Sequence, residues 1–193
     1  MEDTALFLLT VLIILGTPGP TNTLLATSGA AVGWRRSLIL LPAEAAGYLV
    51  SILFLGLVLG PIVAASPAIA LTLRLAVGSY LLALALKLWR RGTVLEDGPI
   101  ATVRPHQVFV TTLLNPKAII FALGVVPLGS PHVWIYLLAF VVLLTIVAFS
   151  WIILGAAMGR VARANGQERI VPRVGAVAIC CFALLIVASP FVR

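Results

Sequence analysis

Long apolar runs, separated by short segments rich in polar residues, glycine and proline, dominate the pattern of this chain. An α-helix rises about 1.5 Å per residue, so roughly 20 apolar residues can cross the ~30 Å hydrocarbon core of a bilayer. The pattern predicts six transmembrane helices, at residues 4–25, 37–60, 67–89, 106–126, 133–157 and 171–188. The runs lack the ten-residue alternation of an outer-membrane barrel. We therefore expect an all-α, polytopic membrane protein.

Composition strengthens the membrane interpretation. Of the 193 residues, 62% are hydrophobic and only 10% are charged. A soluble domain of this length could not cover so much apolar surface with so few charged groups, whereas a lipid-facing surface needs few. We expect a single transmembrane domain over residues 1–193, with the lipid bilayer as its surroundings.

The basic residues give the chain a formal net charge of +7, and their distribution predicts its orientation. Most of them fall in or beside the segments that follow the first, third and fifth predicted helices. These are Arg35, Arg36, Lys87, Arg90, Arg91, Arg104, Arg160, Arg163, Arg169 and Arg173. Loops rich in Lys and Arg stay in the cytoplasm, which predicts a multi-pass inner (plasma) membrane protein with both termini extracytoplasmic. Nucleic acid is not an expected partner, because the basic residues form no single stripe or tail.

The longest predicted loop, at residues 90–105, divides the chain into halves of approximately 1–91 and 104–193. Each half holds three predicted crossings, and an odd number of crossings makes the second half enter the membrane from the opposite side. If the halves share a fold, they form two inverted three-helix repeats, an arrangement common among secondary transporters.

The first predicted helix is interrupted by Pro18, Gly19 and Pro20. Proline removes backbone donors, so we expect this helix to be broken, about 20 Å from its start at Thr4. Backbone groups freed inside hydrocarbon need partners, and a break is tolerated where it faces protein or a water-filled cavity. Asn22 could bond these freed groups or a solute. A simple proline kink is the alternative.

The fourth predicted helix carries a second interruption at Asn115, Pro116 and Lys117, about 16 Å into the membrane. Matching breaks in corresponding helices of two halves indicate a transport site. Half-helices that begin after Pro20 and Pro116 would direct free N–H groups and a partial positive charge at the gap, which favours an anionic group such as a carboxylate. Asn115, like Asn22, could bond the freed backbone or a solute.

Glu44 and Lys117 are the two ionisable residues placed well inside predicted spans. A charge inside the membrane costs at least ~2.5 kcal/mol on insertion scales, so each side chain needs a partner or a wet cavity. Glu44 is a candidate for binding a substrate ammonium or carrying a transported proton, and Lys117 for attracting a substrate carboxylate. The alternatives are a structural Glu44–Lys117 ion pair and a Glu44 side chain that snorkels toward the inner face.

The sequence offers no motif of an enzyme, a metal site or another cofactor site: it has no P-loop and no Ser-His-Asp arrangement, and its histidines lack metal-ligand spacing. Cys180 and Cys181 are adjacent in an apolar run, too strained for an ordinary disulfide. A thiol or redox carrier that uses them is a second hypothesis. A membrane-embedded scaffold that transports nothing is a third.

Three segments resemble the LysE/RhtB family of amino-acid exporters, the LysE-type translocators. They are residues 16–22 (GTPGPTN) followed by Ser28, Gly29, Gly33, Arg35 and Arg36; residues 114–118 (LNPKA); and residues 74–81 (RLAVGSYL). These segments are similar to the family's signatures for its first, fourth and third helices. The similarity covers nearly the whole chain in length, helix count and motif order.

The resemblance implies a secondary exporter of amino acids or related small metabolites, working as a proton-driven antiporter, with a homodimer as an expected assembly. One departure is Glu44, because many relatives have a glycine-rich stretch without an acid at this place. This difference suggests a distinct subgroup, to which the usual substrate need not apply. The substrate-binding candidates are Pro18, Gly19, Pro20, Asn22, Glu44, Asn115, Pro116 and Lys117, with Glu44 also the candidate for proton coupling.

Overall fold

The computed structural model describes residues 4–59, 66–91, 103–167 and 170–188. Within these ranges the chain consists of helices joined by short turns, and no β-strand occurs among them. The predicted all-α class is therefore confirmed. Arg169, which the orientation prediction uses, lies outside the described residues, as does the side chain of Arg91.

The first half of the chain follows its predicted apolar runs. Its helical segments are α1 Thr4–Gly16, α2 Pro20–Val32, α3 Trp34–Ser37, α4 Leu40–Phe54, the π-helical turn η1 Leu55–Leu59 and α6 Pro67–Arg91. The predicted break in the first helix is confirmed, because α1 and α2 meet at a bend of 60°. α2 continues past its predicted end at Leu25, since a helix need not stop where the apolar run stops. It ends at Val32, and the following Gly33 has a φ of +82°, which suits a residue without a side chain.

The second half follows the same pattern. Its helical segments are α7 Pro105–Leu113, α8 Pro116–Ile120, the π-helical turn η2 Phe121–Val125, α9 Val133–Ala164 and α10 Ile170–Ala188. The predicted break in the fourth helix is confirmed, because α7 ends at Leu113 and α8 begins at Pro116. α9 runs past its predicted end at Ala157 to Ala164, where polar residues extend the helix beyond the apolar run.

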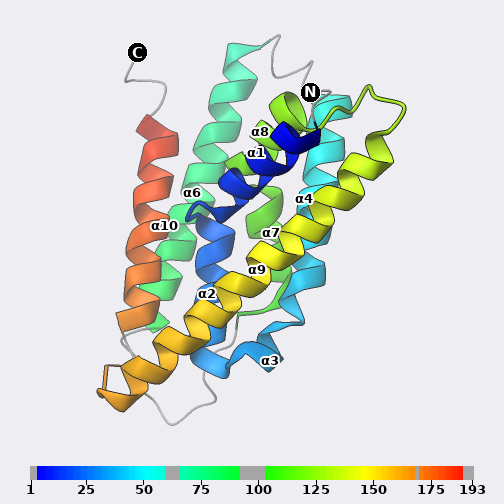
Figure 1. The fold of residues 1–193 in the computed structure, drawn as a ribbon. Coiled ribbons are helices and arrows are strands. Elements are labelled where there is room, and N and C mark those ends of the chain that lie inside the picture. The colour runs from blue at the N-terminus through cyan, green and yellow to red at the C-terminus, as the bar shows by residue number, and fades with distance from the viewer. Residues whose placement is uncertain (1–3, 60–65, 92–102, 168–169, 189–193) are drawn as a thin grey trace.

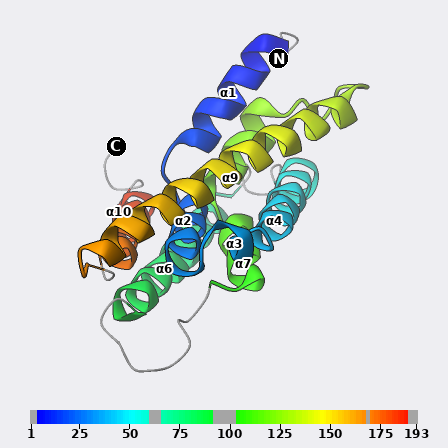
Figure 2. The ribbon, with the colours of Figure 1, turned by 60° about the horizontal axis from the view of Figure 1, so that its bottom comes forward.

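α2 occupies the centre of the bundle. It packs along α9, α10 and α7, while α6 lies beside α10 and α4 lies beside α7. In Figure 1, α9 crosses the front of the molecule at a slant, and α1 packs against it. Figure 2 shows α6 and α10 on one side of α2, and α4 and α7 on the other. The bend at the start of α2 therefore lies among helices from both halves of the chain.

Glycines allow α2 and α9 to approach until their backbones touch. A Cβ atom on Gly29 would lie 2.2 Å from a carbonyl oxygen of α9, and one on Gly155 would lie 1.9 Å from the carbonyl oxygen of Ala26. A Cβ atom on Gly159 would lie 2.4 Å from another carbonyl oxygen of α2. The four-residue spacing of Gly155 and Gly159 places both on one face of α9, the pattern of close helix pairs in membranes.

Apolar side chains cover the outside of the bundle as well as its core. Ile13 on α1 and Trp134 and Leu138 on α9 are all more than half exposed, a surface suited to lipid. Trp34–Val58 and Val133–Ala164 are long and apolar enough to cross a membrane, and the bent pair of α1 and α2 is a third candidate span. These helices support a multi-pass membrane protein. Six spans in two inverted repeats stay a prediction.

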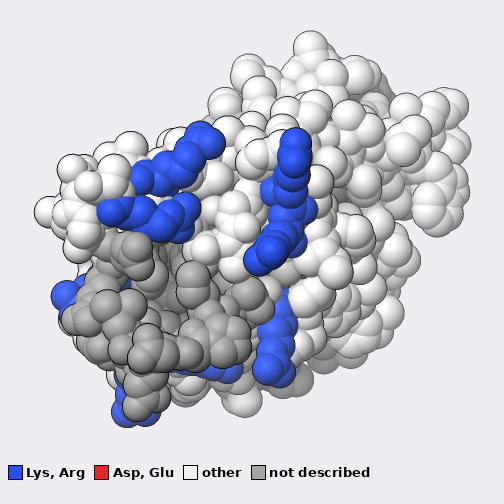
Figure 3. All heavy atoms as spheres, turned by 90° about the horizontal axis from the view of Figure 1, so that it is seen from below, with Lys and Arg blue, Asp and Glu red and all other residues white. Residues whose placement is uncertain are grey.

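Basic side chains gather at one end of the bundle, where α3, the end of α9 and the start of α10 come together (Figures 1 and 3). Arg35 and Arg36 lie on α3, Arg163 lies in the last turn of α9, and Arg173 lies in the first turn of α10. Such a face is what the positive-inside rule expects on the cytoplasmic side. The orientation itself stays a prediction.

Candidate functional site

The break between α1 and α2 frees carbonyl groups at the end of α1, and Asn22 bonds two of them. Its Nδ2 atom donates to the carbonyl oxygens of Leu15 at 2.8 Å and Thr17 at 2.9 Å. The Thr17 hydroxyl donates to the carbonyl oxygen of Ile14 at 2.7 Å. Of the two roles that the sequence left open for Asn22, the structure shows the bond to the freed backbone, and contact with a solute stays a prediction. The bend is a built feature of the fold, because its exposed backbone groups have side-chain partners.

We predict that Asn22→Leu destabilises the protein strongly. Leucine has a similar size but no donor, so two carbonyl oxygens lose a partner, and each loss costs about 1–3 kcal/mol. Thermal unfolding in detergent measures the effect. Asn165→Leu is the matched control, because Asn165 donates to the carbonyl oxygen of Val161 at an exposed helix end. Equal melting temperatures for the two variants would show that the bend does not depend on Asn22.

The break between α7 and α8 is held by two polar side chains. Asn115 caps α8, and its Oδ1 atom accepts the backbone N–H of Lys117 at 3.1 Å. Pro116 occupies the first position of α8, where a missing N–H costs nothing. Ser51, from α4, donates to the carbonyl oxygen of Leu113 at 3.0 Å. Asn115 therefore bonds the freed backbone, one of the two roles that the sequence left open for it, and contact with a solute stays a prediction.

The two breaks meet through Lys117 and Thr21. Lys117 Nζ donates to the carbonyl oxygen of Thr17 at 2.5 Å, which ties the start of α8 to the end of α1. Thr21 Oγ1 accepts from Asn115 Nδ2 at 3.1 Å and from the Thr112 hydroxyl at 3.2 Å. The two interruptions, 100 residues apart in the sequence between Thr17 and Lys117, thus form one polar centre inside an apolar bundle.

The glycine and the prolines differ in their places at this centre. A Cβ atom on Gly19 would lie 3.2 Å from Lys117 Cε, so the glycine leaves room for the lysine side chain. Pro20 is buried at the first position of α2, whereas Pro18 is exposed on the bend. Gly19 and Pro20 therefore lie at the polar centre, whereas Pro18 lies outside it and contributes to the bend between α1 and α2.

Glu44 reaches the same region from α4. It is 1% exposed, and its Oε2 atom is buried without a hydrogen-bond partner in the described part of the chain. Glu44 and Lys117 interact electrostatically, but the ammonium of Lys117 donates to Thr17. A direct ion pair of the two is not formed among the described residues, and the burial of Glu44 excludes snorkelling in this conformation. Glu44 and Lys117 are therefore both buried in the same part of the bundle, without a direct contact between their charged groups in the described structure.

Comparison with known proteins identifies the family to which this chain belongs. The family model described as LysE type translocator matches residues 12–189, which includes both breaks, Glu44 and Lys117. The chain belongs to the LysE type translocator family. The resemblance inferred from the three segments is thereby confirmed, and the chain belongs among membrane transporters. The comparisons with curated proteins and with solved structures give no match.

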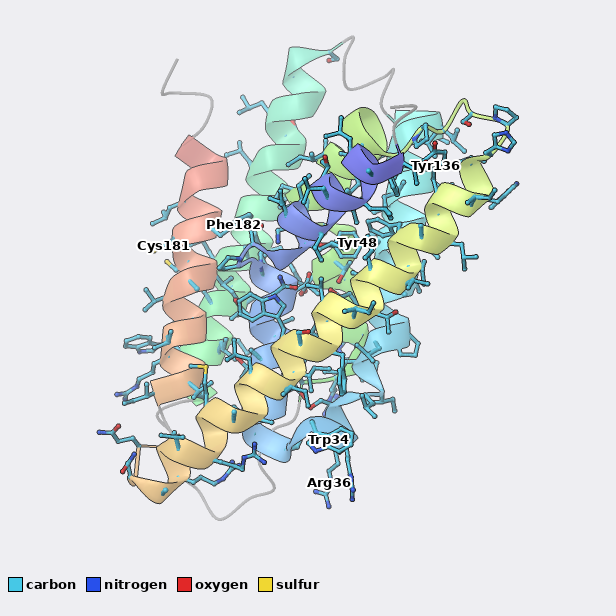
Figure 4. All side chains as sticks on the ribbon, in the orientation of Figure 1. Trp34, Arg36, Tyr48, Tyr136, Cys181 and Phe182 are labelled. Atoms are coloured by element: carbon cyan, nitrogen blue, oxygen red, sulfur yellow. The ribbon has the colours of Figure 1, made fainter. Side chains whose placement is uncertain are left out.

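Tyr48 is a buried residue of the translocator that the sequence interpretation missed, as is Ser51. Tyr48 is 1% exposed, and its hydroxyl accepts a hydrogen bond from Asn115 Nδ2 at 3.2 Å. Its ring packs edge-on against Phe121 and Phe140, with ring centroids 5.9 and 5.7 Å away. Figure 4 shows Tyr48 in the middle of the bundle. The spacing from Glu44 to Tyr48 places both on one face of a helix, which is the signal that could have found it.

Proposed function

We propose that this translocator is a secondary-active exporter of amino acids or related small metabolites across the bacterial inner membrane, coupled to protons as an antiporter. The observation that supports the proposal most is the polar centre where two broken helices meet, with the cation of Lys117 and the acid of Glu44 buried beside them. A charged side chain inside the membrane has a high free-energy cost, and such residues therefore commonly mark a functional site. The proposal assigns no catalytic step and no cofactor to the chain.

Lys117 and the start of α2 provide the proposed contact for a substrate carboxylate. The first N–H groups of α2 have no partners within the helix, and Lys117 adds a full positive charge within reach of Gly19. A carboxylate that binds here would take the place of the Thr17 carbonyl as partner of the ammonium. Glu44 is then the proposed acceptor for the ammonium of the substrate or for the counter-transported proton.

The polar side chains of Asn22 and Asn115 are proposed to contribute to substrate binding by holding the two breaks in place. Both already bond the freed backbone at the two breaks, so their donors and acceptors are largely occupied. They fix the bends, and the bends fix the open helix ends that face the substrate. Pro18, Pro20 and Pro116 contribute to the site in the same way, by keeping the two helices interrupted. A homodimer remains part of the family expectation.

Reconstitution tests the proposed function. Purified protein in liposomes is loaded with a panel of labelled amino acids, and a pH gradient is then imposed. We expect efflux of at least one of them, and we expect a protonophore to abolish the gradient-driven part. If none leaves faster than from protein-free liposomes, the export function is wrong.

We predict that Glu44→Gln lowers gradient-driven efflux at least tenfold, in the range that loss of an essential proton-transfer group produces. Glutamine keeps the size and the hydrogen-bonding capacity of the side chain but cannot carry a proton. Substrate exchange at equal pH on both sides is the matched measurement, since it needs no proton movement. Retained exchange with lost efflux assigns Glu44 to proton coupling, and loss of both assigns it to the substrate ammonium. If both rates stay unchanged, Glu44 has neither role.

A further inference from the structure

Tyr48 has a donor that its observed contacts leave unused. Asn115 Oδ1 accepts the backbone N–H of Lys117, which fixes the orientation of the amide group. Asn115 Nδ2 must therefore donate, and its two protons go to Thr21 Oγ1 and to the Tyr48 hydroxyl. Because the Tyr48 oxygen accepts in this contact, its own O–H proton needs another acceptor.

Glu44 is the candidate for that acceptor, although the described structure shows no hydrogen bond between the two side chains. It lies one helical turn before Tyr48 on α4, and residues four apart on a helix share a face. Both side chains are 1% exposed, and they are close enough to interact electrostatically. Glu44 Oε2 is buried without a hydrogen-bond partner in the described residues. An unused donor and an unused acceptor thus lie on one face of α4, in an interior where each is costly alone.

We infer that Tyr48 is a positioning residue that carries the protonation state of Glu44 to Asn115, and so to the break between α7 and α8. The inference rests on the proposed export function. When Glu44 is ionised, its carboxylate accepts a hydrogen bond from the Tyr48 hydroxyl, and the Tyr48 oxygen is held where Asn115 can donate to it. When Glu44 takes up a proton, it ceases to be a strong acceptor, and Tyr48 loses the contact that fixes its hydroxyl.

The consequence reaches the α1–α2 break through Asn115. Asn115 bonds Thr21 at the start of α2 and caps α8 next to Lys117. Movement of its amide changes the contact between the breaks and the position from which Lys117 reaches Thr17. Proton uptake at α4 is thereby transmitted to the proposed carboxylate contact by two hydrogen bonds, the inferred one that Tyr48 donates to Glu44 and the one that Asn115 donates to Tyr48.

The ionisable groups around Glu44 are few. Lys117, on α8, is the charged group that acts on it, and Tyr48 lies on its own helix. The neighbouring helices α7 and α9 carry His106, Arg160 and Arg163, which are exposed, and Tyr136, which packs on Phe7 at a centroid distance of 4.9 Å. A pH-dependent step in this interior therefore involves Glu44, Tyr48 and Lys117.

Tyr48→Phe tests the inference, because phenylalanine keeps the ring against Phe121 and Phe140 and removes only the hydroxyl. We expect gradient-driven efflux to fall roughly five- to tenfold, the equivalent of one hydrogen bond. The pH profile of efflux should move to higher pH, since the variant lacks the donor that favours the ionised carboxylate. Tyr136→Phe is the matched control and should leave rate and profile unchanged.

A double-mutant cycle distinguishes an effect of Tyr48 that acts through Glu44 from an effect on packing alone. If Tyr48 acts through Glu44, adding Tyr48→Phe to Glu44→Gln should lower efflux no further. Infrared spectroscopy of the Glu44 carboxyl band, identified by its absence in Glu44→Gln, provides a readout without any substrate. That band should titrate at higher pH in Tyr48→Phe than in the parent protein.

The outcomes distinguish the inference from the proposed function. An unmoved carboxyl band and an unchanged pH profile in Tyr48→Phe overturn the role of Tyr48, even if the parent protein exports amino acids. Equal losses for Tyr48→Phe in the presence and absence of Glu44 also overturn it, because they indicate packing alone. Failure of the parent protein to export any substrate, with a shifted band in Tyr48→Phe, overturns the export function and leaves the coupling of the two residues standing.

Discussion

Lys117→Met should reduce both gradient-driven efflux and substrate exchange by roughly a hundredfold. Methionine fills a similar volume beside Gly19 but has no charge, so the proposed carboxylate contact loses its cation and the Thr17 carbonyl loses a donor. A hydrogen bond to a charged group is worth about 1.5–3 kcal/mol, and ~3 kcal/mol corresponds to about two orders of magnitude. Binding of labelled substrate to the purified variant should weaken by the same factor.

Lys87→Met is the control for this experiment. Lys87 is an exposed lysine on α6, so the same exchange of side chains there removes a charge without touching the polar centre. Its efflux and exchange should equal those of the parent protein. If Lys117→Met retained wild-type exchange, Lys117 would have only the structural role of tying α8 to α1. The melting temperature of each variant in detergent distinguishes a lost site from a lost fold.

Gly155→Ala should destabilise the protein by about 1–3 kcal/mol, the usual cost of overfilling a packed interior. The added Cβ atom would lie 1.9 Å from the carbonyl oxygen of Ala26 and 2.5 Å from its carbonyl carbon. These are backbone atoms, which cannot rotate away, so α2 and α9 must separate. Since α2 begins at the polar centre, we also expect efflux to fall. Thermal unfolding in detergent and the reconstituted assay measure the two effects.

Gly16→Ala is the control, because the same exchange of glycine for alanine should not destabilise the protein at this position. A Cβ atom on Gly16 has nothing within 4 Å, and alanine favours a helix by up to about 1 kcal/mol over glycine. This variant should therefore be as stable as the parent protein or slightly more so. If Gly155→Ala were equally stable, the close contact of α2 and α9 would not exist in the membrane.

The helix breaks could be predicted from the sequence because their causes are local. Proline at positions 18, 20 and 116 removes backbone donors wherever the chain folds. An asparagine near each break could likewise be expected to bond the freed groups, and Asn22 and Asn115 do so. The long apolar runs predicted the all-α class because the length of an apolar run is also a local property of the sequence. The family, too, was readable from residues that stand close together in the sequence.

What joins the two breaks could not be predicted, because it depends on how helices pack. Thr21 is a small polar residue without a sequence signal of its own, yet it accepts two hydrogen bonds from the other half of the chain. Tyr48 drew no attention, since a tyrosine in an apolar run is most simply a core or interfacial residue. The π-helical turns η1, at the end of α4, and η2, at the end of α8, contact one another and have no local sequence signature either. The predicted helix ends were placed where hydrophobicity fell, although α2 and α9 extend further.

The hydrogen bond from Lys117 to the Thr17 carbonyl has a consequence for the strength of cargo binding. Without cargo, the ammonium already has a good partner, so an arriving carboxylate must exchange one bond for another. The net gain is smaller than for an empty cationic pocket, which predicts low affinity and fast departure. If the chain exports amino acids as proposed, it should fill only when its solute is abundant inside the cell, and lower intracellular concentrations of that solute should be left intact.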